Sequence, residues 1–132
     1  MVQPVALIFG IIFLIIGVLG FFSSGMSMEA DPMLAPHLFG LFPVNVLHNV
    51  VHLLFGVWGV LAARHWDSAK TYCTVAGILY LALTLLGFII PSTFGLMPIG
   101  GNNILLHAFL GIVLTGVGVT AKPRAEAGTP PL

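Results

Sequence analysis

The chain has 132 residues, of which 58% are hydrophobic and 6% are charged, and its formal net charge is zero at pH 7. Soluble domains carry about 25% charged residues, so this composition excludes an ordinary water-soluble protein and indicates an integral membrane protein. The neutral charge balance gives no sign of a nucleic-acid partner. The single cysteine, Cys73, excludes an intramolecular disulfide and a cysteine-rich metal site.

Hydropathy predicts an all-α bundle of four membrane-spanning helices, each about 18–20 residues long. In chain order they cover Val5–Phe22, Val44–Ala63, Tyr72–Ile90 and Asn103–Ala121. Every Lys and Arg lies on the same side of these spans, namely Arg64, Lys70, Lys122 and Arg124. Because cytoplasmic loops are enriched in Lys and Arg, both termini are predicted to be cytoplasmic. The membrane domain covers residues 1–121, and the Pro- and Gly-containing tail 122–132 is predicted to be disordered.

An internal repeat divides the membrane domain into two helical hairpins, residues 5–63 and 72–121. PHLFGLFPVNVLHNVVHLLFG aligns without a gap with PSTFGLMPIGGNNILLHAFLG; these are residues 36–56 and 91–111. The identities include Pro43/Pro98, His52/His107 and Gly56/Gly111, and the preceding segments 9–22 and 76–89 align as well. Both copies enter the membrane from the same side. This predicts a pseudo-twofold axis along the membrane normal, with the two aligned histidines at similar depth.

Polar and small residues share one face of the second and fourth predicted helices. At 100° per residue these faces carry Asn45, His48, Asn49, His52 and Gly56, and then Asn103, His107 and Gly111. The first and third helices carry small-residue stripes that include Gly10 and Gly77, whereas Val50, Leu54, Val57, Trp58 and Leu61 are predicted to face lipid. Small residues let membrane helices approach closely, and polar side chains hydrogen-bond across the contact. We therefore expect the hairpins to bury their glycine- and imidazole-bearing sides against each other, with the Asn and His side chains acting as polar glue.

The histidines permit three other interpretations. His52 and His107 are candidate axial ligands of a tetrapyrrole, either haem b or chlorophyll, with His48 as a further cofactor-binding residue. His48, His52 and His107 are also candidate ligands of a transition metal, although the spans hold no Asp or Glu to complete the site, so no metal is expected. Because intramembrane ionisable groups are functional candidates by default, proton or ion transport is a third possibility.

The sequence resembles a family of small bacterial membrane proteins known as domain of unknown function 4383. The residues that carry the resemblance are Asn45, His52 and Gly56, the later GGNNILLHAFLG run and the four-helix layout. His52, Gly56, Asn103, His107 and Gly111 match positions characteristic of the family. The resemblance implies a bacterial membrane protein with four helices and implies no activity.

No nucleotide-binding, zinc-protease or nucleophile-elbow pattern is present, and the acidic residues form no catalytic pair. The sequence therefore predicts a non-enzymatic accessory or assembly subunit without a cofactor. Its expected partners are the lipid bilayer and either a larger membrane complex or further copies of itself. The expected location is the bacterial cell membrane or an internal membrane such as the thylakoid.

Overall fold

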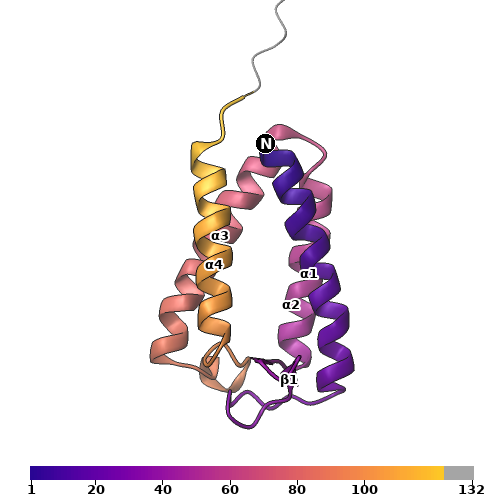
Figure 1. The fold of residues 1–132 in the computed structure, drawn as a ribbon, viewed down its shortest axis with the longest axis vertical. Coiled ribbons are helices and arrows are strands. Elements are labelled where there is room, and N and C mark those ends of the chain that lie inside the picture. Colours follow the sequence, from indigo (N-terminus) through magenta and orange to yellow (C-terminus); the bar gives the residue numbers. More distant parts are fainter. Residues whose placement is uncertain (124–132) are drawn as a thin grey trace, which may run out of the picture.

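The computed structural model describes residues 1–123 and contains two helical hairpins that lie side by side (Figure 1). The helices are α1 (Val2–Ser24), α2 (Val46–Ala62), α3 (Trp66–Ile89) and α4 (Asn103–Thr120). Most helix contacts are made within the pairs α1–α2 and α3–α4, and fewer are made between the pairs. The predicted all-α helical bundle is confirmed. The predicted tail falls outside the described residues from position 124 onward.

Three of the helices, α1, α3 and α4, are long and apolar enough to span a membrane. The fourth, α2, is apolar but has only 17 residues. That length is at the lower limit for crossing the hydrocarbon core. Many large apolar side chains on the helix surfaces are exposed, including Ile15, Leu54, Leu85 and Ile112. Such an apolar surface suits lipid and not water, so the chain is a membrane protein.

Three helices begin at residues other than those predicted from hydropathy, and the first of them, α1, begins at Val2 rather than Val5. α2 begins at Val46 rather than Val44 because Asn45 is extended and its Oδ1 accepts a hydrogen bond from the His48 backbone N–H, at 2.8 Å. This is an N-cap interaction. α3 begins at Trp66, before the predicted start at Tyr72. Charged residues in its first turns lower the local hydropathy without preventing a helix.

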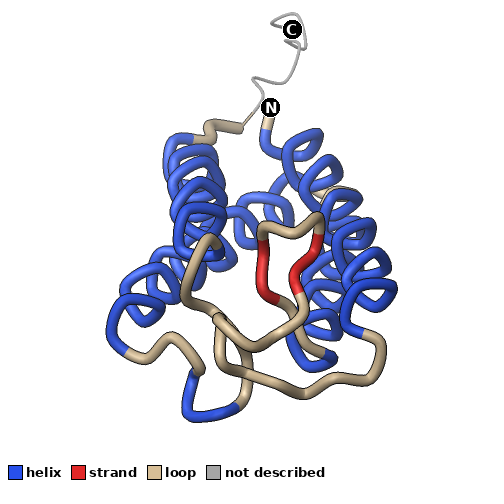
Figure 2. Tube along the Cα trace, turned by 60° about the horizontal axis from the view of Figure 1, so that its bottom comes forward, coloured by secondary structure: helices blue, strands red, loops and turns tan. Residues whose placement is uncertain are grey.

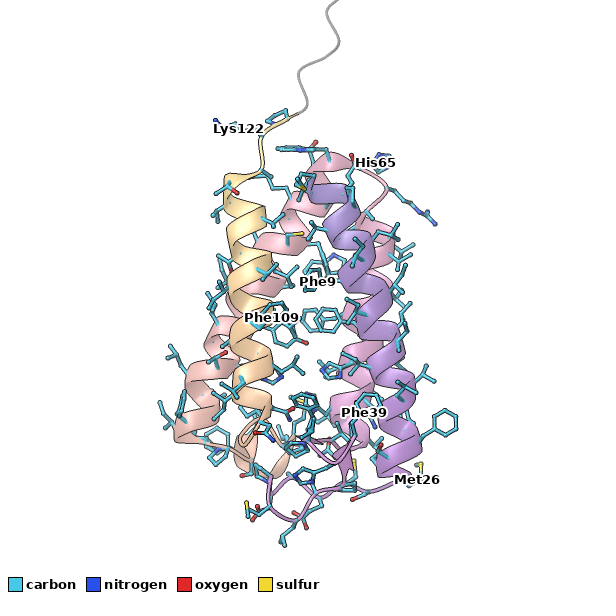
Figure 3. The ribbon with its side chains drawn as sticks, viewed as in Figure 1. Phe9, Met26, Phe39, His65, Phe109 and Lys122 are labelled. Atoms are coloured by element: carbon cyan, nitrogen blue, oxygen red, sulfur yellow. The ribbon has the colours of Figure 1, made fainter. Side chains whose placement is uncertain are left out.

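The N-terminus, the α2–α3 connection and Lys122 lie at one end of the bundle, and Met26 and Phe39 lie at the other (Figures 1 and 3). Two side chains tie this first end together. Gln3 Nε2 donates to the carbonyl of Ala63 at 3.1 Å. Lys70 Nζ donates to the carbonyls of Gly118 and Ala121, at 2.6 and 3.2 Å, and so satisfies the end of α4.

The opposite end is closed by the connections 25–45 and 90–102, which we call the loop cap (Figure 2). The first connection contains a short antiparallel pair, β1 (His37–Leu38) with β2 (Phe42–Pro43). The second contains the 3-10 helix η1 (Thr93–Gly95). Asn45 Nδ2 donates to the Leu96 carbonyl at 2.8 Å, and Asn102 Nδ2 donates to the Leu41 carbonyl at 2.9 Å. These two bonds join the connections of both hairpins into one unit.

Most close approaches at helix glycines occur within a hairpin, although a Cβ atom on Gly59 of α2 would also lie 2.7 Å from Cζ of Tyr72 in α3. A Cβ atom on Gly56 would lie 2.8 Å from the Leu14 backbone nitrogen, and one on Gly111 would lie 2.8 Å from that of Leu81. A Cβ atom on Gly10 would lie 2.7 Å from the Val60 nitrogen. One on Gly77 would collide with the backbone of Thr115. The expectation that glycine-bearing sides meet between the hairpins was therefore wrong for these four glycines, because they pack against the other helix of their own hairpin.

Aromatic side chains fill the centre of the interface between the hairpins. Phe13 of α1 and Tyr80 of α3 stack with ring centroids 5.4 Å apart and an interplanar angle of 18°. Both residues are almost fully buried. Trp58, which was predicted to face lipid, instead packs edge-on against Tyr72 at 4.9 Å. The indole ring of Trp58 is large enough to reach the core from the side of α2.

Candidate functional site

Three buried histidines meet between the hairpins. His48 and His52 lie one turn apart on α2, and His107 comes from α4. One ring nitrogen from each lies within 4.8 Å of the others. Their exposed fractions are 3%, 2% and 0%, so none of the rings contacts the surroundings appreciably. We call these residues the histidine cluster.

The rings of the cluster contact one another directly and are enclosed by aromatic neighbours. The His48 centroid lies 4.4 Å from that of His52 and 5.8 Å from that of His107. Phe13 packs on His52 at 5.8 Å, and Tyr80 packs on His107 at 5.1 Å. Side chains therefore fill the space between the two hairpins (Figure 3).

The imidazoles make few hydrogen bonds despite their burial. Nδ1 of His48, His52 and His107 has no hydrogen-bond partner among the described residues, and neither does Nε2 of His107. A buried polar atom without a partner destabilises a fold by about 1–3 kcal/mol. His107 therefore does not act as polar glue, and the bonding of the other two rings is incomplete.

The asparagines hydrogen-bond where the histidines do not. Asn103 Nδ2 donates to the carbonyls of Pro43 and Pro98, at 2.7 and 2.8 Å, and so joins the two hairpins. Asn49 Nδ2 donates to Ser24 Oγ at 2.8 Å and joins α2 to the end of α1. Together with Asn45, these amides supply the polar contacts that sequence reasoning had assigned to both residue types.

A tetrapyrrole does not fit between His52 and His107. The ring of His48 lies against both of them, in the space that a macrocycle would occupy. The cavity that borders His52 and Asn103 has a volume of about 70 Å³. Pockets for organic cofactors are usually about 300 Å³ or larger. A single metal ion needs far less room and would use the ring nitrogens that already converge.

The set of donors in the cluster is made only of imidazoles. Among residues 1–123, the group contains no Asp, Glu or Cys. His37 lies in the loop cap and His65 lies at the other end of the bundle, so neither belongs to the cluster. Sequence reasoning identified the three histidines but not the aromatic enclosure. Phe13 and Tyr80 occupy aligned positions in the two copies of the repeat, and this was the available signal.

A comparison with protein families matches residues 3–120 to the family described as Domain of unknown function (DUF4383). The chain belongs to this family. The match covers both hairpins and ends at the last residue of α4. No curated protein and no solved structure gives a significant match. The description of the family names no activity, so the chemistry must be argued from the residues themselves.

Proposed function

We propose that the chain is a non-catalytic accessory subunit of a bacterial membrane, and that it docks onto a partner membrane protein through the loop cap. The observation that carries the proposal is a pair of exposed phenylalanines, Phe39 and Phe94, at aligned positions of the repeat. Phe39 is 70% exposed and Phe94 is 80% exposed. Each is followed two residues later by a leucine that is about half exposed, Leu41 or Leu96.

Both phenylalanines adopt a backbone conformation that favours glycine. Their φ angles are +56° and +57°. A left-handed conformation destabilises a residue other than glycine by roughly 1–2 kcal/mol. Fluid lipid would accept these rings in any orientation. Holding two aligned rings in an unfavourable conformation instead supports an occupant with a defined shape, such as the apolar surface of another protein.

The loop cap is also held rigidly, which suits docking. The bonds from Asn45 and Asn102 cross between the connections, and Asn103 ties the Pro43 and Pro98 carbonyls beneath them. A rigid surface loses little conformational entropy on binding. The carboxylates of the cap, Glu29 and Asp31, bond to nearby backbone N–H groups in exposed turns. Their setting supports a structural role and not a catalytic one.

The test isolates the protein from its own membrane in mild detergent and compares three forms on a native gel. The wild type is expected to migrate as a complex, and the Phe39→Ala/Phe94→Ala double variant is expected to migrate alone. The matched control is Phe22→Ala/Phe88→Ala, which removes two exposed rings outside the loop cap and should retain the complex. A wild type that migrates alone would contradict the proposal. So would a crosslinker at position 94 that reacts only with lipid.

A further inference from the structure

The geometry points to a binding site for one monovalent copper ion, held by His48, His52 and His107 between the two hairpins. This inference goes beyond the proposed docking function, since it concerns the histidine cluster and not the loop cap. Three observations support it. The donor nitrogens have a suitable spacing, they lack hydrogen bonds, and among the described residues no Asp, Glu or Cys joins the three histidines.

The donor atoms are already near the required spacing. Three nitrogens placed symmetrically around a metal ion at bond lengths of about 2 Å lie about 3.5 Å from one another. In the structure the three nitrogens are within 4.8 Å of one another. Side-chain rotations that move each ring by roughly 1 Å would close the site. His48 and His52 are four residues apart on one helix face, and His107 supplies the third ligand from the other hairpin.

The unpartnered nitrogens supply the reason for binding an ion. A neutral imidazole has one N–H donor and one nitrogen lone pair. At least one ring nitrogen of each cluster residue is buried without a partner. A metal ion would accept lone pairs that the protein leaves unused. The bound ion would also link α2 of the first hairpin to α4 of the second.

The charge of the cluster favours a monovalent ion. Three neutral imidazoles do not reduce the charge of the ion that they bind, and no carboxylate or thiolate joins the group among residues 1–123. The desolvation penalty of an ion in an apolar interior rises with the square of its charge. Imidazole binds copper and zinc well, and of the common oxidation states only Cu(I) carries a single charge. Phe13 and Tyr80 cover two of the rings and keep water from the site.

The loop cap also carries soft ligands. Met26, Met28 and Met33 are exposed in the connection between α1 and β1, at the end of the bundle where α2 begins. Thioether sulfur selects Cu(I) over zinc and harder ions. These side chains are suited to binding Cu(I) at the same end of the bundle as His48, which lies in the first turn of α2.

The test titrates the full chain in mild detergent after treatment with a metal chelator. Cu(I) is added without oxygen and in competition with a chromophoric Cu(I) chelator, and Zn(II) is titrated in parallel. We expect one Cu(I) per chain. His48→Asn, His52→Asn and His107→Asn should each weaken binding by at least about 100-fold, since losing even a supporting residue commonly weakens a metal site 10- to 100-fold. His37→Asn and His65→Asn are matched controls and should bind as the wild type does.

X-ray absorption of the loaded wild-type protein does not depend on any variant folding. Three nitrogen ligands with imidazole scattering and a Cu(I) edge are expected. A site with sulfur ligands, binding equal to that of the His48→Asn/His52→Asn/His107→Asn triple variant, or tighter binding of Zn(II) than of Cu(I) would each overturn the inference. The Phe39→Ala/Phe94→Ala variant should bind Cu(I) normally, so that failure of the docking proposal and failure of the copper site are distinguished.

Discussion

The two hairpins make corresponding contacts at several aligned positions, and they differ where the histidine cluster forms. Gly56 packs on Leu14 in the first hairpin as Gly111 packs on Leu81 in the second. The backbone bond from Val44 N–H to the Pro36 carbonyl is 2.8 Å long, and its counterpart in the second hairpin is 2.9 Å long. The aligned pair 48/103 is different, because it is His in the first hairpin and Asn in the second.

This one difference separates a structural residue from a candidate ligand. Asn103 bonds the carbonyl of Pro98 in its own hairpin and that of the aligned Pro43 in the other. A single amide therefore serves both copies. His48 keeps an unpartnered Nδ1 in the corresponding position and turns toward His52 and His107. The repeat thus retains its backbone packing while one copy carries the extra imidazole.

The largest expected effect comes from the glycines, which test whether the hairpins are equivalent. Gly10→Ala and Gly77→Ala each place a methyl group against a neighbouring helix backbone, so each should lower the free energy of unfolding by about 2–3 kcal/mol. Reversible unfolding in mixed micelles measures both. Gly116→Ala is the control, because a Cβ there meets no atom within 4 Å, and it should be neutral or slightly stabilising. Unequal losses of unfolding free energy at Gly10 and Gly77 would show that the two hairpins are not equivalent.

A smaller effect is expected at the amide that joins the hairpins. Asn103→Ala leaves the Pro43 and Pro98 carbonyls without this donor, and the free energy of unfolding should fall by about 1–2 kcal/mol. The same unfolding measurement applies. Asn102→Ala removes a more exposed bond to the Leu41 carbonyl and should change stability by less than about 0.5 kcal/mol. Equal losses for the two variants would show that the buried amide has no special role.

The smallest effect is expected at the aligned partner of that amide. His48→Asn gives the first hairpin the residue of the second and removes an unpartnered imidazole nitrogen. The free energy of unfolding of the metal-free protein should change by less than about 0.5 kcal/mol. A loss as large as that of Asn103→Ala would mean that His48 stabilises the hairpin interface. The comparison between the copies would then need a different explanation.

The sequence was sufficient to predict the helices and to single out the three histidines that the fold brings together, because hydropathy and residue type are local properties. It placed α2 too early because hydropathy does not detect an N-cap, and Asn45 ends the extended segment just before Val46. It placed α3 too late because Asp67 and Lys70 are charged yet compatible with a helix. The membrane side of each end stays a prediction from the Lys and Arg distribution.

The sequence did not predict which helix each polar or small-residue face contacts, because this depends on how the helices pair. Periodicity placed Gly10 and Gly77 on small-residue faces, but it did not say that these faces meet α2 and α4 of the same hairpins. It also placed Asn and His on one face as equivalent polar residues. Their different roles follow from the carbonyls of Pro43 and Pro98, which approach Asn103 only in the folded bundle.

The amides hold the hairpins together, and we infer that the imidazoles are free to bind a ligand. The most direct test compares the free energies of unfolding of metal-free His107→Leu and Asn103→Leu, two replacements by an apolar side chain of similar size. His107 has two unpartnered ring nitrogens, so His107→Leu should be as stable as the wild type or more stable. Asn103→Leu should be less stable by about 1–2 kcal/mol. A His107→Leu variant destabilised as much as Asn103→Leu would show instead that the imidazole of His107 holds the hairpins together.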